Sequence, residues 1–277
     1  MKKIIVPVDF SEHSEYALEL AAQLARKHDA EIIALHMLEI SESLLNKAEG
    51  QGYNEALFFM KMAAKRFEDF LDKEYLKGLK VTDIVQHHKV FTEVNETALK
   101  HNADLIIMGS HGTGGIKELF MGSNAEKVVR TAQLPVLVVK NRMPDFNIKK
   151  VVFAMDFHIE NAEAYVRAMN LFKELNAEVE LLYVNLPNDN FKSSDEIEDI
   201  IASFLQRMEG NSAKMEDVAI RNDYFVEKGV FNYSNKVKAD LIAIPTHGRK
   251  GLSHFFLGSI GEDIVNHASI PVITFKM

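Results

Sequence analysis

The chain has 277 residues, of which 47% are hydrophobic and 26% charged, an ordinary globular composition with enough length for two domains. Its formal net charge of −8 argues against non-specific binding to nucleic acid or to anionic membranes. It contains no cysteine, which excludes disulfides, thiolate nucleophiles and cysteine-ligated metals, and no apolar run long enough to span a membrane. We therefore expect a soluble cytoplasmic protein.

The sequence contains an internal repeat. Residues 2–37 resemble residues 149–184, which places Asp9 over Asp156, and "LPVLVVK" near the end of the first half resembles "IPVITFK" near the end of the second. The offset falls from 147 residues at the aspartates to 136 at these later motifs, so the first half carries eleven extra residues within 41–79. The repeat predicts two related domains.

Within each half, short β-branched runs alternate with segments of helical spacing. The strands expected in the first half are "IIVPV" (4–8), "EIIALHM" (31–37), "TDIVQHH" (82–88), "DLIIMG" (104–109) and "PVLVV" (135–139). The first helical face is formed by Ala17, Leu20, Ala21, Leu24 and Ala25. Strand alternating with helix indicates a parallel sheet covered on both faces. We predict two tandem doubly wound α/β domains, 1–141 and 149–277, each with five strands and joined by "NRMPDFNI" (141–148).

A long helix is expected over residues 54–77, and it carries an unusual number of large apolar side chains. These are Phe58, Phe59, Met60, Met62, Phe67 and Phe70. Because their spacing partly follows one helix face, we expect them to pack in the core. The alternative is a surface that binds apolar ligands or unfolded chains.

Two glycine-rich loops follow apolar strands, "GSHGTGGIKELFMGS" (109–123) after "ADLIIM" and "PTHGRKGLSHFFLGS" (245–259) after "ADLIAI". Ligands of doubly wound sheets bind at the carboxyl ends of the strands. Glycine lets backbone N–H groups approach phosphate oxygens, and the free amides of the next helix favour anions. That helix should start after Gly122, with Ser123 and Asn124 as candidate N-caps, and run to about Thr131. A flexible connection is the alternative, but two copies with the same spacing favour a phosphate site.

Two familiar phosphate-binding signatures do not fit the chain. A Walker loop needs lysine followed by serine or threonine after its last glycine, whereas Gly122 is followed by Ser123 and Asn124. A Rossmann fingerprint belongs at the first strand-to-helix turn, which here reads "VDFSEHS". Both classes are therefore disfavoured.

The pattern Gly109-x2-Gly112-x9-Gly122-Ser123, with "VPVDFS" at the end of the first strand, resembles the universal stress protein family in its ATP-binding subset. The resemblance covers both halves. It implies strand order 3-2-1-4-5 in each domain and an adenine nucleotide (ATP, ADP or AMP) across the carboxyl ends of strands one, two and four. Mg²⁺ would accompany ATP. The implied function is regulation in the stress response, through a protein partner that the sequence does not name.

In the first half, the resemblance assigns nucleotide contacts to Pro7, Val8, Asp9, Met37, Gly109, His111, Gly112, Gly122, Ser123 and Asn124. Asp9 would accept hydrogen bonds from ribose or adenine, and backbone groups of Met37 would meet the adenine edge. The glycines and the start of the last helix would hold ribose and phosphates. Asp9 has an alternative role as the N-terminal cap of the following helix.

In the second half, the corresponding residues are Asp156, Val184, Gly248, Gly258, Ser259 and Ile260. Pro245 stands where the first half has Gly109, and Ala154 replaces Pro7. Proline has no N–H, so any donor at that point is lost. Arg249 and Lys250 either contact a phosphate or face solvent. We expect the first half to hold the stronger site.

Evidence for catalysis in the sequence is thin. His111 and His247 occupy equivalent loop positions and either carry protons or order their own loops. Adjacent histidines in "QHH" (86–88) would point to opposite faces of a strand, so no metal site is predicted. We predict no catalytic residues and at most slow ATP hydrolysis. The alternatives to a nucleotide-binding regulator are a slow ATPase or phosphotransferase and a chaperone-like module for small apolar ligands.

The resemblance also implies that the two domains pair through their last strands, "PVLVV" and "PVITF". Those strands are apolar and β-branched, and pairing would cover their exposed edges. The chain would then form an intramolecular pseudo-dimer, with a homodimer as a further arrangement.

Overall fold

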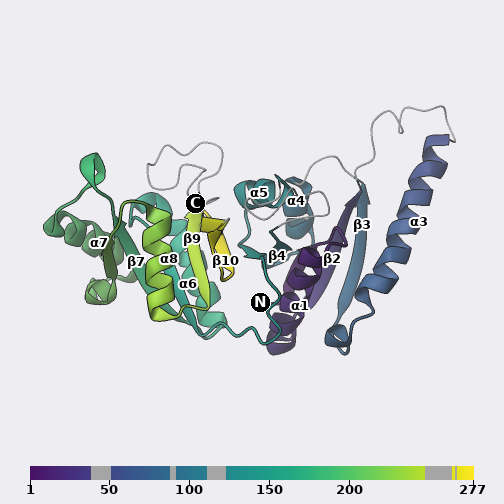
Figure 1. The fold of residues 1–277 in the computed structure, drawn as a ribbon, viewed down its shortest axis with the longest axis horizontal. Helices are drawn as coiled ribbons and strands as arrows, with labels where there is room; N and C mark the ends of the chain where they lie inside the picture. Colours follow the sequence, from purple (N-terminus) through teal and green to yellow (C-terminus); the bar gives the residue numbers. More distant parts are fainter. Residues whose placement is uncertain (39–50, 88–91, 111–122, 247–263, 266) are drawn as a thin grey trace. The chain divides into compact units, whose positions relative to one another are not determined.

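The computed structural model describes residues 1–38, 51–87, 92–110, 123–246, 264–265 and 267–277 (Figure 1). The chain divides into two compact units, Met1–Phe146 and Asn147–Met277. The division lies inside the segment 141–148 between the two copies of the repeat. In the described part of the chain, no helix is long and apolar enough to cross a lipid bilayer.

Unit 1 is a parallel sheet with helices packed on it. Its elements in chain order are β1 (Lys3–Pro7), α1 (Glu12–His28), β2 (Glu31–Leu38), α3 (Gln51–Leu71), the 3₁₀ turn η1 (Glu74–Leu76), β3 (Val81–His87), α4 (Thr92–Lys100), β4 (Leu105–Gly109), α5 (Ser123–Thr131) and β5 (Val136–Val139). The strands lie in the order β3-β2-β1-β4-β5. Each expected strand is present within one residue of its predicted ends.

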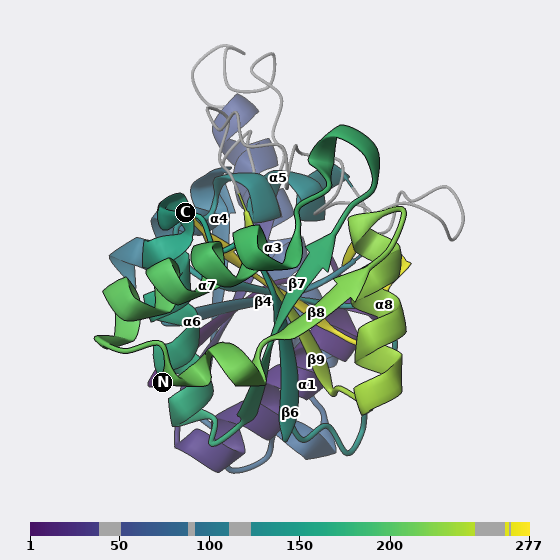
Figure 2. The same ribbon diagram turned by 90° about the vertical axis from the view of Figure 1, so that its left-hand side faces the viewer.

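Unit 2 repeats this plan. Its elements are β6 (Lys150–Ala154), η2 (Ile159–Asn161), α6 (Ala162–Glu174), β7 (Glu178–Asn185), η3 (Asn188–Asn190), α7 (Ser194–Glu209), η4 (Ala213–Asp217), β8 (Ala219–Asn222), α8 (Val226–Val237), β9 (Leu241–Thr246) and β10 (Val272–Lys276). Its parallel strands lie in the order β8-β7-β6-β9-β10, which is 3-2-1-4-5 when counted within the unit. Figure 2 shows α6 and α7 on one face of this sheet and α8 on the other. The predicted α/β class is confirmed.

The core of unit 1 follows from its hydrophobic pattern. Ile4, Ile5 and Val6 of the central strand are fully buried, because helices cover both faces of the sheet. Helix α1 buries the predicted alanine and leucine face against β1 and β4. The helix begins after Ser11 and ends at Asp29, which adopts the left-handed conformation of a helix C-cap.

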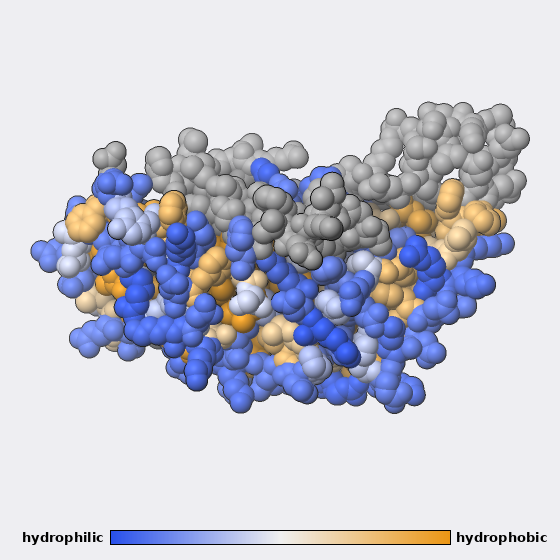
Figure 3. Space-filling view, viewed as in Figure 1, coloured by the Kyte–Doolittle hydropathy of each residue, from blue (hydrophilic) through white to orange (hydrophobic). Residues whose placement is uncertain are grey.

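Helix α3 corrects one expectation about the core. Phe67 and Phe70 are buried, but Phe58, Phe59, Met60 and Met62 are exposed, so the predicted burial of those four was wrong. The helix packs on β2 and β3 with Ala63, Phe67 and Phe70 buried, whereas residues 57–60 are a continuous apolar run whose side chains point to all sides of the helix. Figure 3 shows apolar side chains at the surface over α3.

The segment that follows β5 is held on helix α1. Arg142 donates two hydrogen bonds to Glu19, at 2.8 and 2.9 Å. The Gln23 amide donates to the Met143 carbonyl and accepts from the Phe146 N–H, both at 2.7 Å. The residues up to Phe146 are therefore an integral part of unit 1.

Candidate functional site

The candidate site of unit 1 lies where β2, β1 and β4 end. These strands are neighbours, so their carboxyl ends share one edge of the sheet. Pro7 ends β1, and the Val8 N–H continues the ladder by donating to the Leu35 carbonyl at 2.8 Å. Met37 lies near the end of β2 and is partly exposed. Gly109 ends β4. The structure thus brings together the predicted adenosine-binding residues.

Asp9 follows β1 directly and is partly exposed. Its Oδ1 accepts from the Ser11 backbone N–H at 3.0 Å and from the Ser11 hydroxyl at 2.5 Å. Ser11 is the residue that caps α1, because its Oγ accepts from the Ser14 N–H at 3.2 Å. The alternative role of Asp9 as the helix cap is therefore wrong. Asp9 instead orients the residue that caps the helix, and this fixes its own carboxylate at the sheet edge.

Phe10 takes a left-handed backbone conformation, with φ of 63°, which is rare for a bulky residue. Its ring packs against His36, Phe67 and Phe70, with centroid distances of 4.6, 5.0 and 5.5 Å. The Arg66 guanidinium lies over the same ring at 4.3 Å. These contacts hold the sharp turn between β1 and α1, and with it Asp9.

The packing of Phe10 against His36, Phe67 and Phe70 was not predicted from the sequence. The signal was available, because the dipeptide Asp-Phe recurs at the end of the first strand of both repeats. Phe157 in unit 2 has φ of 57° and packs its ring against Phe204, with centroids 5.7 Å apart. A repeated aromatic residue at a strand-to-helix turn therefore marks a strained position held by packing.

The fold requires glycine at position 109 whether or not a ligand binds there. A Cβ placed on it would lie 2.6 Å from the His13 carbonyl oxygen and 2.7 Å from the His13 carbonyl carbon. The first turn of α1 therefore crosses the end of β4 at a distance that only glycine permits. In unit 2, η2 occupies Ile159–Asn161 and α6 starts only at Ala162, three residues later in the repeat than α1. Pro245 stands in the glycine's place there.

The predicted phosphate-binding loops lie outside the described residues. This applies to His111, Gly112, Gly122, His247, Gly248, Arg249, Lys250, Gly258, Ser259 and Ile260. Helix α5 spans Ser123–Thr131, which confirms the predicted helix, but Ser123 and Asn124 are its first two residues and not its N-cap. The first amides of a helix lack partners within it, which makes this helix start suitable for an anion.

The corresponding edge of unit 2 is more enclosed. The Asp156 side chain is only 3% exposed, and its Oδ1 accepts from the Asn161 amide and from the His158 N–H at 3.1 Å. Val184 is 1% exposed, because Gly229 of α8 lies directly against its side chain. Asp156 and Val184 are therefore buried, whereas the corresponding residues of unit 1, Asp9 and Met37, are partly exposed.

The whole chain matches a known family. The model of the universal stress protein family matches residues 1–140 and again residues 147–276. The chain belongs to the universal stress protein family. It is a tandem member, with one repeat in each unit.

Known proteins are similar to this chain either over about half of its length or over nearly all of it. Universal stress proteins MJ0531 and MJ0577 of Methanocaldococcus jannaschii are 36% and 35% identical, over 50% and 51% of this chain and 82% and 96% of their own. A universal stress protein of Mycolicibacterium smegmatis is 22% identical over 99% of this chain and 96% of its own. The solved universal stress protein of Archaeoglobus fulgidus, at 21% identity, has a TM-score of 0.63, with coverage of 99% of this chain and 96% of its own. That likeness supports the fold.

In this tandem universal stress protein, His36 joins β2 to the turn after β1. Its Nδ1–H donates to the Val8 carbonyl at 2.7 Å. Burial lowers the pKa of His36 from its ordinary value, and the positive charge of Arg66 adds to this effect, whereas the bond to Val8 and the charge of Asp9 oppose it. The ring is therefore held neutral close to Asp9.

Acidification is expected to destabilise unit 1 through His36. The pKa of His36 in the folded protein lies below the unfolded value of 6.5. The contribution of neutral His36 to the stability of unit 1 is therefore complete above pH 6.5 and is lost as pH falls through the folded pKa. Urea unfolding at about pH 7.5 and pH 5.5 should show a smaller loss of stability for His36→Asn than for the wild type. Asn retains a donor toward Val8 but does not titrate. An identical loss in both proteins would contradict this role.

Proposed function

We propose that this protein is an adenine-nucleotide-binding regulator of the stress response, and that it binds ATP, ADP or AMP at the carboxyl edge of unit 1. The observation that carries the proposal is the partly exposed carboxylate of Asp9, oriented by Ser11 between the ends of β2 and β4. Family membership and the motif spacing support it. The cytoplasmic location remains a prediction.

Each part of a nucleotide has a matching feature on this edge. The Asp9 carboxylate suits ribose hydroxyls or the adenine amino group, which donate hydrogen bonds. Backbone groups of Met37 suit the adenine edge. The loop through Gly112 and Gly122 leads to the amino end of α5, whose amides favour phosphates. In the described ranges, no three His, Asp or Glu side chains cluster to hold a metal. Any Mg²⁺ would therefore be bound with the help of the phosphates.

We further propose that unit 2 contributes little nucleotide affinity. Asp156 is buried, whereas Asp9 is partly exposed, Val184 is covered by α8, and Pro245 cannot donate a hydrogen bond. The expected stoichiometry is one nucleotide per chain. Pairing of the two units through "PVLVV" and "PVITF", and the identity of a protein partner, stay predictions.

A chaperone-like function is the second candidate. The exposed apolar side chains of α3, Leu57, Phe58, Phe59, Met60 and Met62, favour it. Slow ATP turnover rests on His111, which lies outside the described residues, and so has no structural support.

Calorimetry on nucleotide-free protein tests the principal proposal. ATP, ADP and AMP should bind with dissociation constants of roughly micromolar size, which corresponds to about −8 kcal/mol. GTP should bind more weakly because its base presents a different edge to Met37. The absence of heat with all three adenine nucleotides would refute the proposal.

Replacement of Ser123 by alanine separates phosphate binding from adenosine binding. A hydrogen bond to a charged group contributes roughly 1.5–3 kcal/mol, so Ser123→Ala should weaken ATP about tenfold. Adenosine, which has no phosphate, should bind this variant as it binds the wild type. An equal loss for both ligands would show that Ser123 acts only through the fold of α5.

A further inference from the structure

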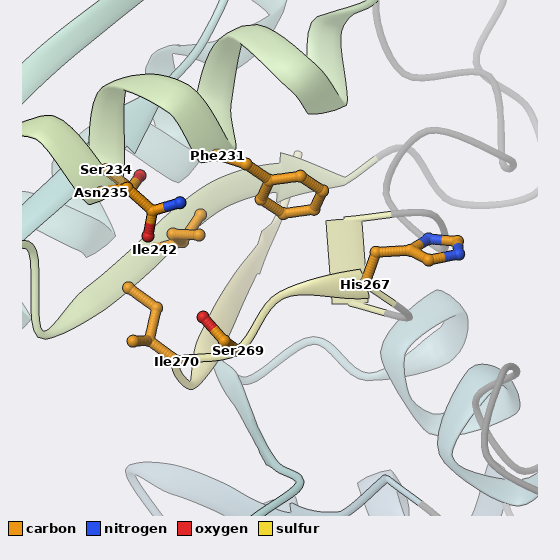
Figure 4. A pocket seen from close by; sticks show the side chains of 7 residues that line it. All are labelled: Phe231, Ser234, Asn235, Ile242, His267, Ser269 and Ile270. Carbon is orange, nitrogen blue, oxygen red and sulfur yellow. The ribbon is translucent and has the colours of Figure 1, made fainter.

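Unit 2 contains a pocket at the opposite end of its strands from the proposed nucleotide edge. It lies between the second half of α8, the start of β9 and the segment before β10 (Figure 4). Its lining consists of Phe231, Ser234, Asn235, Ile242, His267, Ser269 and Ile270. Because Ile242 is the second residue of β9 and Ile270 precedes β10, the pocket opens near the amino ends of these strands. It is therefore separate from any site at their carboxyl ends.

Ser234 gives the pocket an unusual polar atom. The residue is 2% exposed, and its hydroxyl oxygen has no hydrogen-bond partner in the described part of the chain. Nearly all buried hydroxyl groups in proteins are hydrogen-bonded, because an unpaired one is costly. Ser234 lines the pocket, so a molecule held there can supply the missing partner.

The corresponding place in unit 1 carries different side chains. Residues 136 positions earlier in the chain correspond to those of unit 2, as they do for the glycine motifs. Ala98 stands in place of Ser234 and is fully buried. Asn95 stands in place of Phe231, and its Oδ1 accepts from the Gln133 N–H at 2.7 Å. In unit 1 the Asn95 side chain thus joins helix α4 to the segment before β5, and the position of Ser234 has no hydroxyl.

The lining defines the chemistry of a ligand. Phe231, Ile242 and Ile270 offer apolar surface, and Figure 4 shows the three side chains around one space. None of the lining residues is Lys, Arg, Asp or Glu, and the titratable residue of the lining, His267, lies at its exposed side, so no group in the buried part of the pocket balances a full charge. The volume of about 200 Å³ equals roughly seven water molecules at liquid density, which suits a single small ring.

We propose that this pocket binds a small uncharged molecule with an apolar ring and one hydroxyl or carbonyl group, which hydrogen-bonds to Ser234. Such a site is independent of nucleotide binding in unit 1. Unit 2 would then bind a ligand of a different chemical class from the nucleotide of unit 1.

Phenol and toluene are suitable probes, because they have nearly the same shape and toluene carries a methyl group where phenol has its hydroxyl. Amide NMR spectra of the full chain should show that millimolar phenol shifts residues 231–235 and 267–270 and leaves Val8 and Asp9 unchanged. Phenol should bind about fivefold more tightly than toluene, the effect of one ordinary hydrogen bond. Added ATP should not compete with phenol.

Two variants test the assignment. Ser234→Ala, which copies Ala98, should fold normally and lose the preference for phenol. Ser269→Trp, at an exposed position of the lining, should block both probes. The proposal is overturned if phenol shifts no amide of this lining, if it shifts other residues instead, or if Ser234→Ala keeps the fivefold preference. Wild-type nucleotide binding in both variants would show that any loss of phenol binding is local.

Discussion

Asp9→Ala is expected to weaken ATP and adenosine together, by about 10- to 100-fold, whereas Asp156→Ala should leave both affinities unchanged. A charged hydrogen bond contributes roughly 1.5–3 kcal/mol, and Asp9 would make such bonds with ribose or adenine. Asp156 is enclosed and already bonded to Asn161 and His158. Calorimetry with both ligands on both variants measures the difference.

Asp156→Ala should instead reduce stability. It removes the acceptor of the buried Asn161 amide, and an unpaired buried donor costs about 1–3 kcal/mol. Urea unfolding should therefore show a loss of this size with wild-type affinity for ATP. A loss of ATP affinity or a halved stoichiometry in Asp156→Ala would assign a working site to unit 2.

Two controls separate the carboxylate of Asp9 from its effect on helix α1. Asp9→Asn keeps an oxygen that accepts from Ser11 but removes the negative charge, so it should fold normally and still bind nucleotide more weakly. Ser11→Ala removes the helix cap, which costs about 1 kcal/mol, and the hydroxyl that donates to Asp9, but it keeps the carboxylate itself and the hydrogen bond from the backbone N–H of residue 11. If Ser11→Ala weakened ATP as much as Asp9→Ala, the aspartate would act through the helix alone.

The fold was predictable because its signals are local and occur twice. Strand positions follow from β-branched runs such as "LIIM", and the repeat fixes the division of the chain into two units. The predicted grouping of Pro7, Asp9, Met37 and Gly109 follows from the rule that parallel strands end at one edge. These inferences need no knowledge of side-chain packing.

Features that depend on packing between distant segments were not predictable. The enclosure of the unit 2 edge requires Asn161 to bond back to Asp156 and α8 to lie on Val184, and neither follows from the repeat. The exposure of Phe58 depends on how far α3 reaches along β2 and β3. Sequence similarity between the repeats therefore concealed a difference between their two edges.

Gly109 is the sharpest case of a motif residue with two roles. The glycine pattern predicts contact with ribose and phosphate, yet α1 also requires a residue without a Cβ at this position. In Gly109→Ala the new carbon would lie 2.6 Å from the carbonyl oxygen of His13, a backbone atom that cannot rotate away. Either β4 or the first turn of α1 must shift, and that turn follows directly on Ser11, whose N–H and hydroxyl donate to the Asp9 carboxylate.

Gly109→Ala is expected to destabilise unit 1 by about 3 kcal/mol, the upper range for overpacking, and to weaken nucleotide binding because Asp9 moves with α1. Gly229→Ala is the matched control. Its Cβ would lie 2.7 Å from Val184 Cγ1, a similar distance, but the neighbour is a side chain and the position is inside helix α8. Alanine gains about 1 kcal/mol of helix propensity there, which offsets the crowding, so we expect a change within about 1 kcal/mol. Urea unfolding followed by circular dichroism, with hydrogen exchange of α1 and α8 peptides to assign each transition, measures both. Equal stability of Gly109→Ala and wild type would mean that α1 does not cross β4 this closely, and that the glycine serves the ligand alone.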